Sequence, residues 1–186
     1  MKIVFIRHGE CDKSGADERG FIGLGRDLAP LTAVGVAQAQ AAAESPLLSG
    51  CQLILSSPYT RALQTAAIIA GRTGLELRVE LDLHELIPDK TFQVRGEAEA
   101  VALHEDFKRC HGACPPDESR RWETLEELVR RTRPVLDRYQ ALGYEKIAVV
   151  AHGGLIRRYT GERVIGYCHV SEMVYSANFR CHGWIL

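Results

Sequence analysis

Three short, continuous apolar runs constrain the fold of this chain more than any other feature of its sequence. They cover residues 2–6, 52–55 and 147–151, and they are rich in branched side chains. Runs of this length without alternation are typical of strands that are buried on both faces of a sheet. We therefore expect three parallel-type strands in the core.

Segments rich in helix formers follow these runs. Helices are expected from Thr32, a plausible N-cap, to about residue 48, over residues 60–70 with Gly71 as a stop, and over residues 155–164. Alternating strands and helices predict an α/β fold, a three-layer α/β/α sandwich with a mainly parallel central sheet. Because 186 residues is close to the usual domain size, we expect one domain over residues 1–186.

The remaining segments give weaker signals. We predict a strand over 77–81, loops over 12–30 and 82–92, and a helix over 98–110. An amphipathic helix is expected over 117–142, with a kink or break at Pro134. Strands over 172–179 and 181–186 are expected to form a closing hairpin.

The charge balance argues against polyanionic partners. Lys and Arg total 23 against 24 Asp and Glu, so no overall positive field attracts nucleic acid or anionic lipid. No apolar run approaches the length of a membrane span, and the opening run is too short for a signal peptide. We expect a cytoplasmic protein with six reduced cysteines, no membrane association and no sequence signal for its oligomeric state.

Polar motifs stand where the three buried strands end. These are Arg7-His8-Gly9, Ser57-Pro58 followed by Arg61, and His152-Gly153-Gly154. Ligands of open α/β sheets bind beyond the carboxyl ends of the strands, so we expect these motifs to converge on one crevice. Arginine binds phosphate oxygens with two parallel hydrogen bonds, and imidazole can attack phosphorus or move protons. The motifs therefore predict a small phosphorylated substrate.

The motifs also support a family assignment. Arg7-His8-Gly9-Glu10, Pro30-Leu31-Thr32 with Gly35 and Gln38-Ala39, the segment Ser57–Ala66, and His152-Gly153-Gly154 occur in this order. With these motifs the chain resembles the histidine phosphatase superfamily, in the branch that includes cofactor-dependent phosphoglycerate mutases and small phosphatases. The joint occurrence is far more specific than a lone Arg-His-Gly. The resemblance implies a phosphoglycerate mutase-like fold.

The resemblance implies a role for each motif residue. His8 is the expected nucleophile, which forms a phosphohistidine, and Arg7, Arg61 and His152 are expected to surround the phosphoryl group. Gly153 belongs to the expected substrate-binding set.

Two further roles map less directly. Ser14 stands where the family often has an asparagine that contacts phosphate or substrate. The family takes its general acid from after the third strand, which maps best to Glu85, with Asp82 as the fallback. Glu10, beside the nucleophile, is expected to be structural or orienting.

The expected activity is that of a metal-independent phosphatase that needs no cofactor and acts on a phosphate monoester. The alternatives are a protein phosphohistidine phosphatase, a phosphoglycerate mutase, and a catalytically silent phosphate-binding module. The segment Leu86-Ile87-Pro88-Asp89 argues against a mutase, because mutases have a basic, glycine-containing segment there. Cys110-His111 and Cys114 with Cys181-His182 could form a zinc site, but their spacing is irregular.

Overall fold

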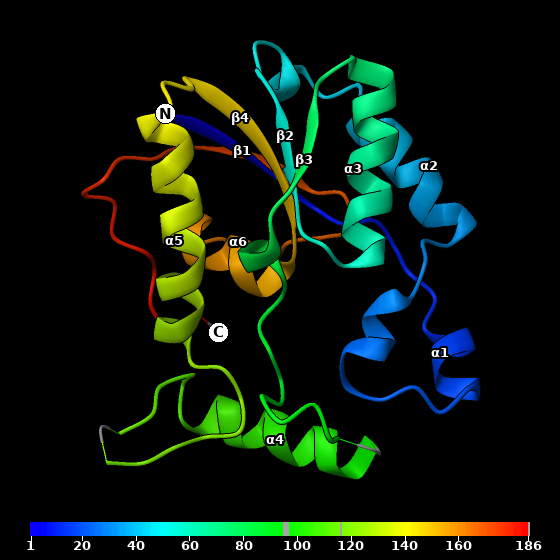
Figure 1. The fold of residues 1–186 in the computed structure, drawn as a ribbon, viewed down its shortest axis with the longest axis vertical. Helices are drawn as coiled ribbons and strands as arrows, with labels where there is room; N and C mark the ends of the chain where they lie inside the picture. The colour runs from blue at the N-terminus through cyan, green and yellow to red at the C-terminus, as the bar shows by residue number, and fades with distance from the viewer. Residues whose placement is uncertain (95–96, 116, 186) are drawn as a thin grey trace.

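A five-stranded sheet in the order β3-β2-β4-β1-β5 forms the centre of the computed structural model, which describes residues 1–94, 97–115 and 117–185 (Figure 1). Four strands run parallel: β1 (Lys2–Arg7), β2 (Ile54–Ser56), β3 (Leu77–Val79) and β4 (Lys146–Ala151). At one edge, β5 (Val170–Val174) pairs antiparallel with β1. The three apolar runs thus form β1, β2 and β4, as predicted.

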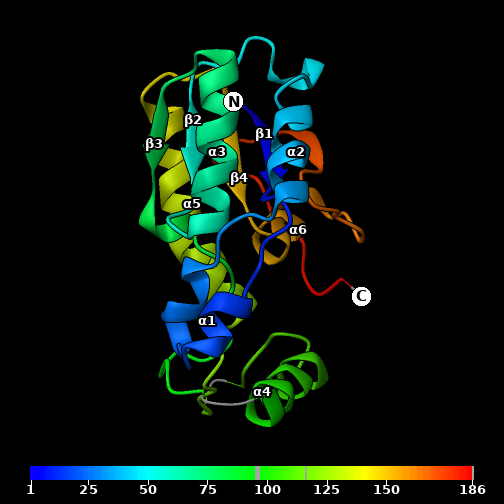
Figure 2. The same cartoon turned by 90° about the vertical axis from the view of Figure 1, so that its right-hand side faces the viewer.

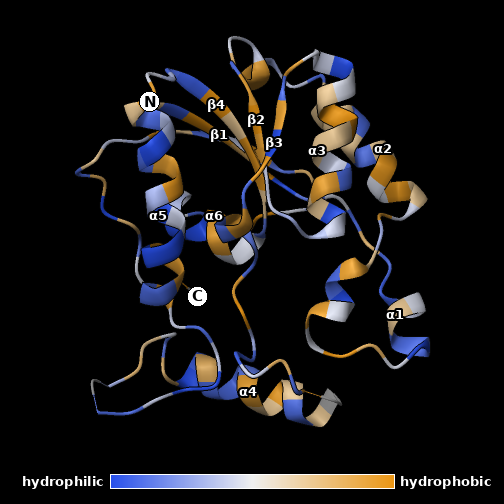
Figure 3. Cartoon of the chain, in the orientation of Figure 1, coloured by the Kyte–Doolittle hydropathy of each residue, from blue (hydrophilic) through white to orange (hydrophobic). Residues whose placement is uncertain are grey.

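Helices cover both faces of this sheet (Figures 1 and 2). Ile3 and Phe5 of β1 pack in the core with α5 (Leu125–Ala141) and α6 (Gly153–Thr160). Val4 and Ile6 pack in a second core with α2 (Ala33–Ala42) and α3 (Thr60–Thr73). Successive strand residues point to opposite faces, so a continuous apolar run supplies both layers. Figure 3 shows these strands as largely hydrophobic, and the predicted three-layer α/β/α sandwich is confirmed.

The starts of α2 and α3 lie at the predicted positions, but α2 ends at Ala42 instead of near residue 48, and α6 covers Gly153–Thr160 instead of 155–164. The Thr32 hydroxyl accepts a hydrogen bond from the Gly35 amide at 2.9 Å and caps α2. Helix α3 continues through Gly71 and ends at Gly74, which adopts a left-handed conformation with φ 73°. A glycine ends a helix by providing this conformation, and Gly71 does not adopt it.

Helix α5 is shorter than the amphipathic pattern predicts. Thr124 and Glu127 form a reciprocal capping box that fixes the start, so the predicted helical residues before Leu125 are not part of it. The chain remains helical through Pro134, so the predicted break is wrong.

The predicted closing hairpin is also wrong. Only β5 forms, and residues 181–185 contain no strand, while Leu186 lies outside the described residues. The His182 amide instead donates to the Arg158 carbonyl at 2.7 Å, and the Arg158 side chain donates to the carbonyls of His182 and Gly183. Contacts with α6 therefore satisfy backbone groups that a second strand would have paired.

Short helices occupy the segments beyond the carboxyl ends of the parallel strands. The predicted first loop contains α1 (Ser14–Glu18) and the 3-10 helix η1 (Gly23–Leu28), and α4 covers Glu97–Arg109. Figures 1 and 2 place α1 and α4 at the same end of the molecule. Two further 3-10 turns, η2 (Pro46–Leu48) and η3 (Leu81–Leu83), lie in connections. Across the described ranges, no helix is long and apolar enough to span a membrane.

Close backbone packing joins the turn after β1 to α2, and it generates a stability prediction. A Cβ atom added at Gly35 would lie 2.0 Å from the backbone oxygen of Glu10. We expect Gly35→Ala to lower the free energy of unfolding by about 1–3 kcal/mol, because the backbone must move apart. Urea unfolding measures the change.

The same substitution in α3 provides the control. Gly71 is exposed, and an added Cβ would meet nothing within 4 Å. We expect Gly71→Ala to raise the free energy of unfolding by about 0.5–1 kcal/mol, because alanine loses less conformational entropy in a helix. Equal effects of the two substitutions would contradict the packing argument.

Candidate active site

His8 follows the last residue of β1, and its side chain is only 6% exposed. Its Nδ1 lies 2.8 Å from the carbonyl oxygen of Gly9. A carbonyl oxygen only accepts, so Nδ1 carries the ring proton and Nε2 carries the lone pair. Burial lowers the pKa of His8 to about 3, and the nearby charges of Arg61 and Arg7 act in the same direction. His8 is thus a neutral imidazole at neutral pH.

Arg61 lies in the first turn of α3 and is 5% exposed. Its Nε donates to Nε2 of His8 at 3.3 Å, and its Nη1 lies 2.7 Å from a carboxylate oxygen of Asp27. Its guanidinium also lies 5.0 Å from the centre of the Tyr59 ring. The pairing with Asp27 offsets the cost of burying this charge.

A side-chain hydroxyl fixes the position of α3 relative to β1. The Thr65 hydroxyl donates to the Arg61 carbonyl at 2.7 Å and accepts from the Gly9 amide at 3.0 Å. The backbone segments that hold His8 and Arg61 are therefore joined through one buried group.

His152 follows the last residue of β4 and precedes α6, and it is fully buried. Its ring centre lies 5.1 Å from that of His8, and its Nε2 lies 2.7 Å from the Ser57 hydroxyl. Its buried Nδ1 has no hydrogen-bond partner within the described part of the chain. Burial holds the pKa of His152 well below its usual value, so two neutral imidazoles face each other.

Arg7 lies at the end of β1 and is half-buried. Its Nη1 donates to the Ile165 carbonyl at 2.6 Å, and its guanidinium lies 4.3 Å from the centre of the Tyr167 ring. Its Nε is buried without a partner among the described residues. A Cβ on Gly153 would lie 3.8 Å from this Nε, so the Gly153 backbone lies beside Arg7.

Glu85 reaches the same region from the segment after η3. Its Oε1 accepts from the Leu86 amide at 2.8 Å, and its Oε2 accepts from the Gly154 amide at 3.2 Å. A Cβ on Gly154 would lie 2.6 Å from Glu85 Oε1, so the Glu85 carboxylate lies directly against the start of α6. Asp82 is exposed and does not line the pocket described below, so the geometry favours Glu85 over Asp82 as proton donor.

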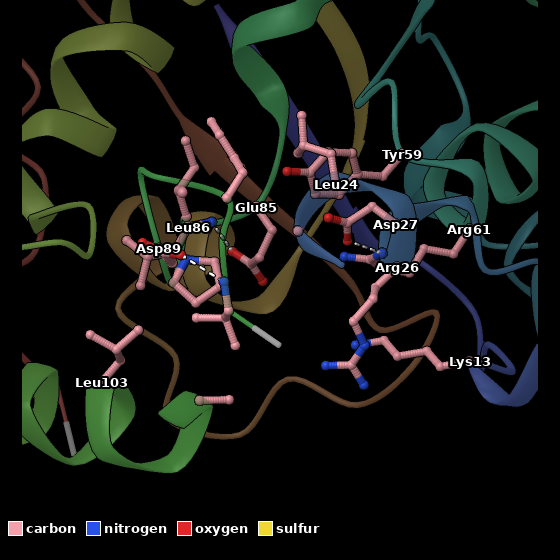
Figure 4. Close-up of a pocket in the computed structure, with 16 residues that line it drawn as sticks. Lys13, Leu24, Arg26, Asp27, Tyr59, Arg61, Glu85, Leu86, Asp89 and Leu103 are labelled. Carbon is pink, nitrogen blue, oxygen red and sulfur yellow. Dashed lines mark hydrogen bonds and ion pairs between the residues drawn. The ribbon is translucent and has the colours of Figure 1, made fainter. Parts of the chain in front are cut away.

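A pocket of about 200 Å³ opens beside Arg61 and Glu85, and its lining residues do not include His8, Arg7 or His152 (Figure 4). Arg61, Glu85 and Tyr59 line it, and so do Lys13 and Asp27, to which the sequence patterns assign no role. Tyr59 lies within a recognised motif, whereas Asp27 lies in a segment without periodicity. Nothing in the local sequence marks Asp27 as the partner of Arg61.

Two other candidate residues have different surroundings. Ser14 is exposed at the start of α1 and lines a separate surface depression with Asp12 and Phe21, so the structure does not bring it to the pocket. Glu10 accepts a hydrogen bond from the Thr32 hydroxyl at 2.8 Å, which fits the structural or orienting role expected for it.

The described residues contain no cluster of three or more His, Cys, Asp or Glu side chains that could hold a metal ion. The zinc alternative therefore finds no support in that part of the chain. All six cysteines lie within the described ranges and none forms a disulfide.

The chain is similar in sequence to known proteins. The sequence model of the histidine phosphatase superfamily (branch 1) matches residues 3–165. The chain is 33% identical over 155 residues to the uncharacterized phosphatase PhoE of Bacillus subtilis, covering 83% of this chain and 72% of that protein. It is 30% identical over 156 residues to the probable phosphoglycerate mutase GpmB of Proteus mirabilis, covering 82% of this chain and 70% of that protein.

Solved structures share the fold over nearly the whole chain. A mycobacterial glucosyl-3-phosphoglycerate phosphatase in complex with VO3 superposes with a TM-score of 0.70 at 23% identity, covering 100% of this chain and 98% of that chain. The α-ribazole phosphatase from Shigella flexneri gives a TM-score of 0.67 at 21% identity, covering 99% and 96%.

The buried state of His8 generates a prediction on stability in acid. The unfolded chain binds a proton at this residue below about pH 6.5, whereas the folded pKa is lowered to about 3. The stability present above pH 6.5 is therefore lost as the pH falls toward 3. Between pH 6.5 and 5 we expect the wild type to lose about 2 kcal/mol more than His8→Gln. Urea unfolding at both pH values measures this difference, and equal losses would contradict it.

Proposed function

The chain belongs to the histidine phosphatase superfamily, and from this premise we propose that it is a phosphatase that hydrolyses a phosphate monoester through a covalent phosphohistidine on His8. The observation that supports this most directly is the hydrogen bond from Nδ1 of His8 to the Gly9 carbonyl. It leaves the Nε2 lone pair of a neutral ring facing Arg61. A neutral imidazole is the nucleophilic form.

In the first step, Nε2 of His8 attacks phosphorus, and the bond from phosphorus to the ester oxygen breaks. Arg61 donates to Nε2 in the structure, so this donor must shift to a phosphoryl oxygen before attack. Arg7 and His152 each have a buried nitrogen without a partner among the described residues, and both nitrogens can donate to the phosphoryl group. A preorganised donor of this kind contributes about 3–4 kcal/mol to the stability of a transition state.

Glu85 supplies the proton that the departing oxygen needs. It accepts two backbone hydrogen bonds, and one carboxylate oxygen must release its donor to transfer a proton. In the second step, the same carboxylate takes a proton from water as the water attacks phosphorus. The bond from phosphorus to Nε2 then breaks, which restores the neutral imidazole and releases phosphate.

The alternatives fit the site less well. The wall beyond Glu85 is formed by Leu86, Ile87 and Pro88, which carry no positive charge, whereas the cationic lining side chains Lys13, Arg26 and Arg61 lie on the other side of the pocket (Figure 4). A silent binding module would not need a proton donor, yet Glu85 and Arg61 line the same pocket (Figure 4). A protein phosphohistidine substrate would use the same nucleophile, and the substrate panel described below distinguishes it.

The covalent intermediate gives a direct test. The wild type, mixed with p-nitrophenyl phosphate and a chelator and quenched in alkali, is expected to retain phosphate on the protein, because phosphohistidine is stable to base. Acid should release it. His8→Ala is expected to retain none and to lose about 10⁴-fold or more in kcat, because the nucleophile is gone. His104→Ala, which removes an exposed imidazole from α4, is the matched control and should behave as the wild type. Labelling of His8→Ala would refute the proposal.

The proton donor is tested by comparing leaving groups. An alkoxide must be protonated as it departs, whereas p-nitrophenolate leaves without a proton. We expect Glu85→Gln to lower kcat about 10²–10⁴-fold for an alkyl phosphate and by less than about tenfold for p-nitrophenyl phosphate. Asp82→Asn is the control and should change neither rate. Steady-state kinetics that show the selective loss in Asp82→Asn would assign the role to Asp82 instead.

A further inference from the structure

The pocket beside Arg61 has two chemically different ends. Lys13, Arg26 and Arg61 lie on one side in Figure 4, with Glu85 in the middle and Leu86 and Leu103 on the other side. Beyond Glu85 the lining side chains are mostly hydrocarbon, from Leu86, Ile87, Pro88, Phe92, Val94 and Leu103, and Leu24 of η1 adds to this apolar lining. A ligand whose phosphate reaches Arg61 would place its remaining atoms against this wall.

The one acidic residue in the wall is fully engaged within the protein. Asp89 is 4% exposed, and both of its carboxylate oxygens accept from Arg121, at 3.1 and 3.0 Å. The same carboxylate accepts from the amides of Thr91, Gln93 and Val94 at 2.9–3.1 Å. The Arg121 guanidinium holds the pKa of Asp89 well below its usual range. This carboxylate is therefore not free to bind a ligand.

Three other backbone donors of the wall are also used. The Leu86 amide donates to Glu85, the Ile87 amide donates to Glu123 at 3.0 Å, and the Phe92 amide donates to a backbone carbonyl at 3.0 Å. A carboxylate or second phosphate on the leaving group would lose water there and would meet few free donors among the described residues. Burying a polar group without a hydrogen-bond partner is unfavourable in free energy, because its hydrogen bonds to water are lost and not replaced.

The positive charges at the polar end are largely committed as well. Arg26 binds both carboxylate oxygens of Asp17, at 2.8 and 3.3 Å, and Arg61 is paired with Asp27. The polar end can therefore receive one phosphoryl group through Arg61. Lys13 is a further positive charge at this end, and it lies on the opposite side of the pocket from Leu86 and Leu103, so it faces the phosphoryl group rather than the leaving group (Figure 4).

The size of the pocket limits the length of the ligand. Gly23 of η1 has φ 52°, and an added Cβ would lie 2.7 Å from the Phe92 carbonyl oxygen, so the two walls touch there. The pocket volume is about 200 Å³. An apolar cavity of about 150 Å³ accepts a benzene molecule. One aromatic ring or a short alkyl chain therefore fits.

We propose that the substrate of this phosphatase is a phosphate monoester with a hydrocarbon leaving group, an aryl or short alkyl alcohol, and not a carboxylated or polyphosphorylated metabolite. The inference rests on the proposed function for the position of the phosphate. It follows from an apolar wall in which Asp89 and the amides of Leu86, Ile87 and Phe92 are bonded within the protein. Burial of hydrocarbon then supplies most of the selectivity.

Binding of phosphonates tests the inference without turnover, because their bond from carbon to phosphorus is not hydrolysed. By calorimetry we expect benzylphosphonate to bind the wild type at least tenfold more tightly than methylphosphonate, and phosphonoacetate to bind no more tightly than methylphosphonate. Phosphonoacetate binding as tightly as benzylphosphonate would overturn the inference. Failure of all three phosphonates to bind would overturn it together with the phosphate site.

Variants of the lining, each compared with a control on the same helix, test whether the apolar lining produces the preference for benzylphosphonate. Leu24→Ser and Leu103→Gln alter the apolar lining and should lower the ratio of benzylphosphonate to methylphosphonate affinity about three- to tenfold, with methylphosphonate affinity unchanged. The controls are Leu28→Ser in η1 and Val101→Gln in α4, which are exposed and do not line the pocket. They should leave the ratio unchanged. Equal ratios in all four variants would overturn the inference.

Kinetics separate this inference from the proposed function. Values of kcat/KM for phenyl phosphate, 3-phosphoglycerate, glucose 6-phosphate and a phosphohistidine peptide are compared. A preference of tenfold or more for phenyl phosphate supports the inference. Hydrolysis of all four at similar rates, or a preference for any of the other three, would overturn it and leave the His8 chemistry intact. Absence of hydrolysis of every ester would overturn the proposed function itself.

Discussion

The site depends on an uncharged imidazole buried between a carbonyl oxygen and a guanidinium group. The Gly9 carbonyl fixes the ring proton of His8 on Nδ1, and Arg61 faces the lone pair on Nε2. An arginine in such a position must itself be buried, and a buried charge persists only when it is paired. Asp27 provides that pair at 2.7 Å. Asp27 belongs to no recognisable motif, yet its carboxylate is needed to keep the Arg61 guanidinium charged and buried.

Parallel strand pairing brings these groups together. In the sheet, Arg7 lies opposite Ala151, and Ser56 lies opposite Val150. The next residues along the three strands are His8, His152 and Ser57, so they leave the sheet at the same edge. Convergence of segments that are far apart in the sequence therefore follows from register.

This dependence on register explains what could be predicted from the sequence. Buried strands and the polar residues at their ends leave a local pattern, which predicted the three-layer fold and the positions of His8, Arg61 and His152. The closing hairpin could not be predicted, because residues 181–183 bond to Arg158, a contact with no local signal. The pairing of Asp27 with Arg61 and the exposed position of Ser14 could not be predicted either. Both depend on how short helices without sequence periodicity pack in the folded chain.

The segment after Glu85 shows why substrate selection is harder to predict than chemistry. It has neither helical nor strand periodicity, yet Asp89 organises it by accepting several amides that secondary structure would otherwise pair. Those hydrogen bonds occupy amide donors that a polar leaving group could otherwise use. The hydrocarbon side chains of the segment line the pocket. The charged groups to which we assign phosphoryl transfer thus lie at the end of the sheet, and the adjoining wall is apolar. The charged residues at the end of the sheet and the apolar wall are held by different hydrogen bonds. We therefore expect that substitutions in the wall can change which alcohol is accepted without altering the proposed phosphoryl site.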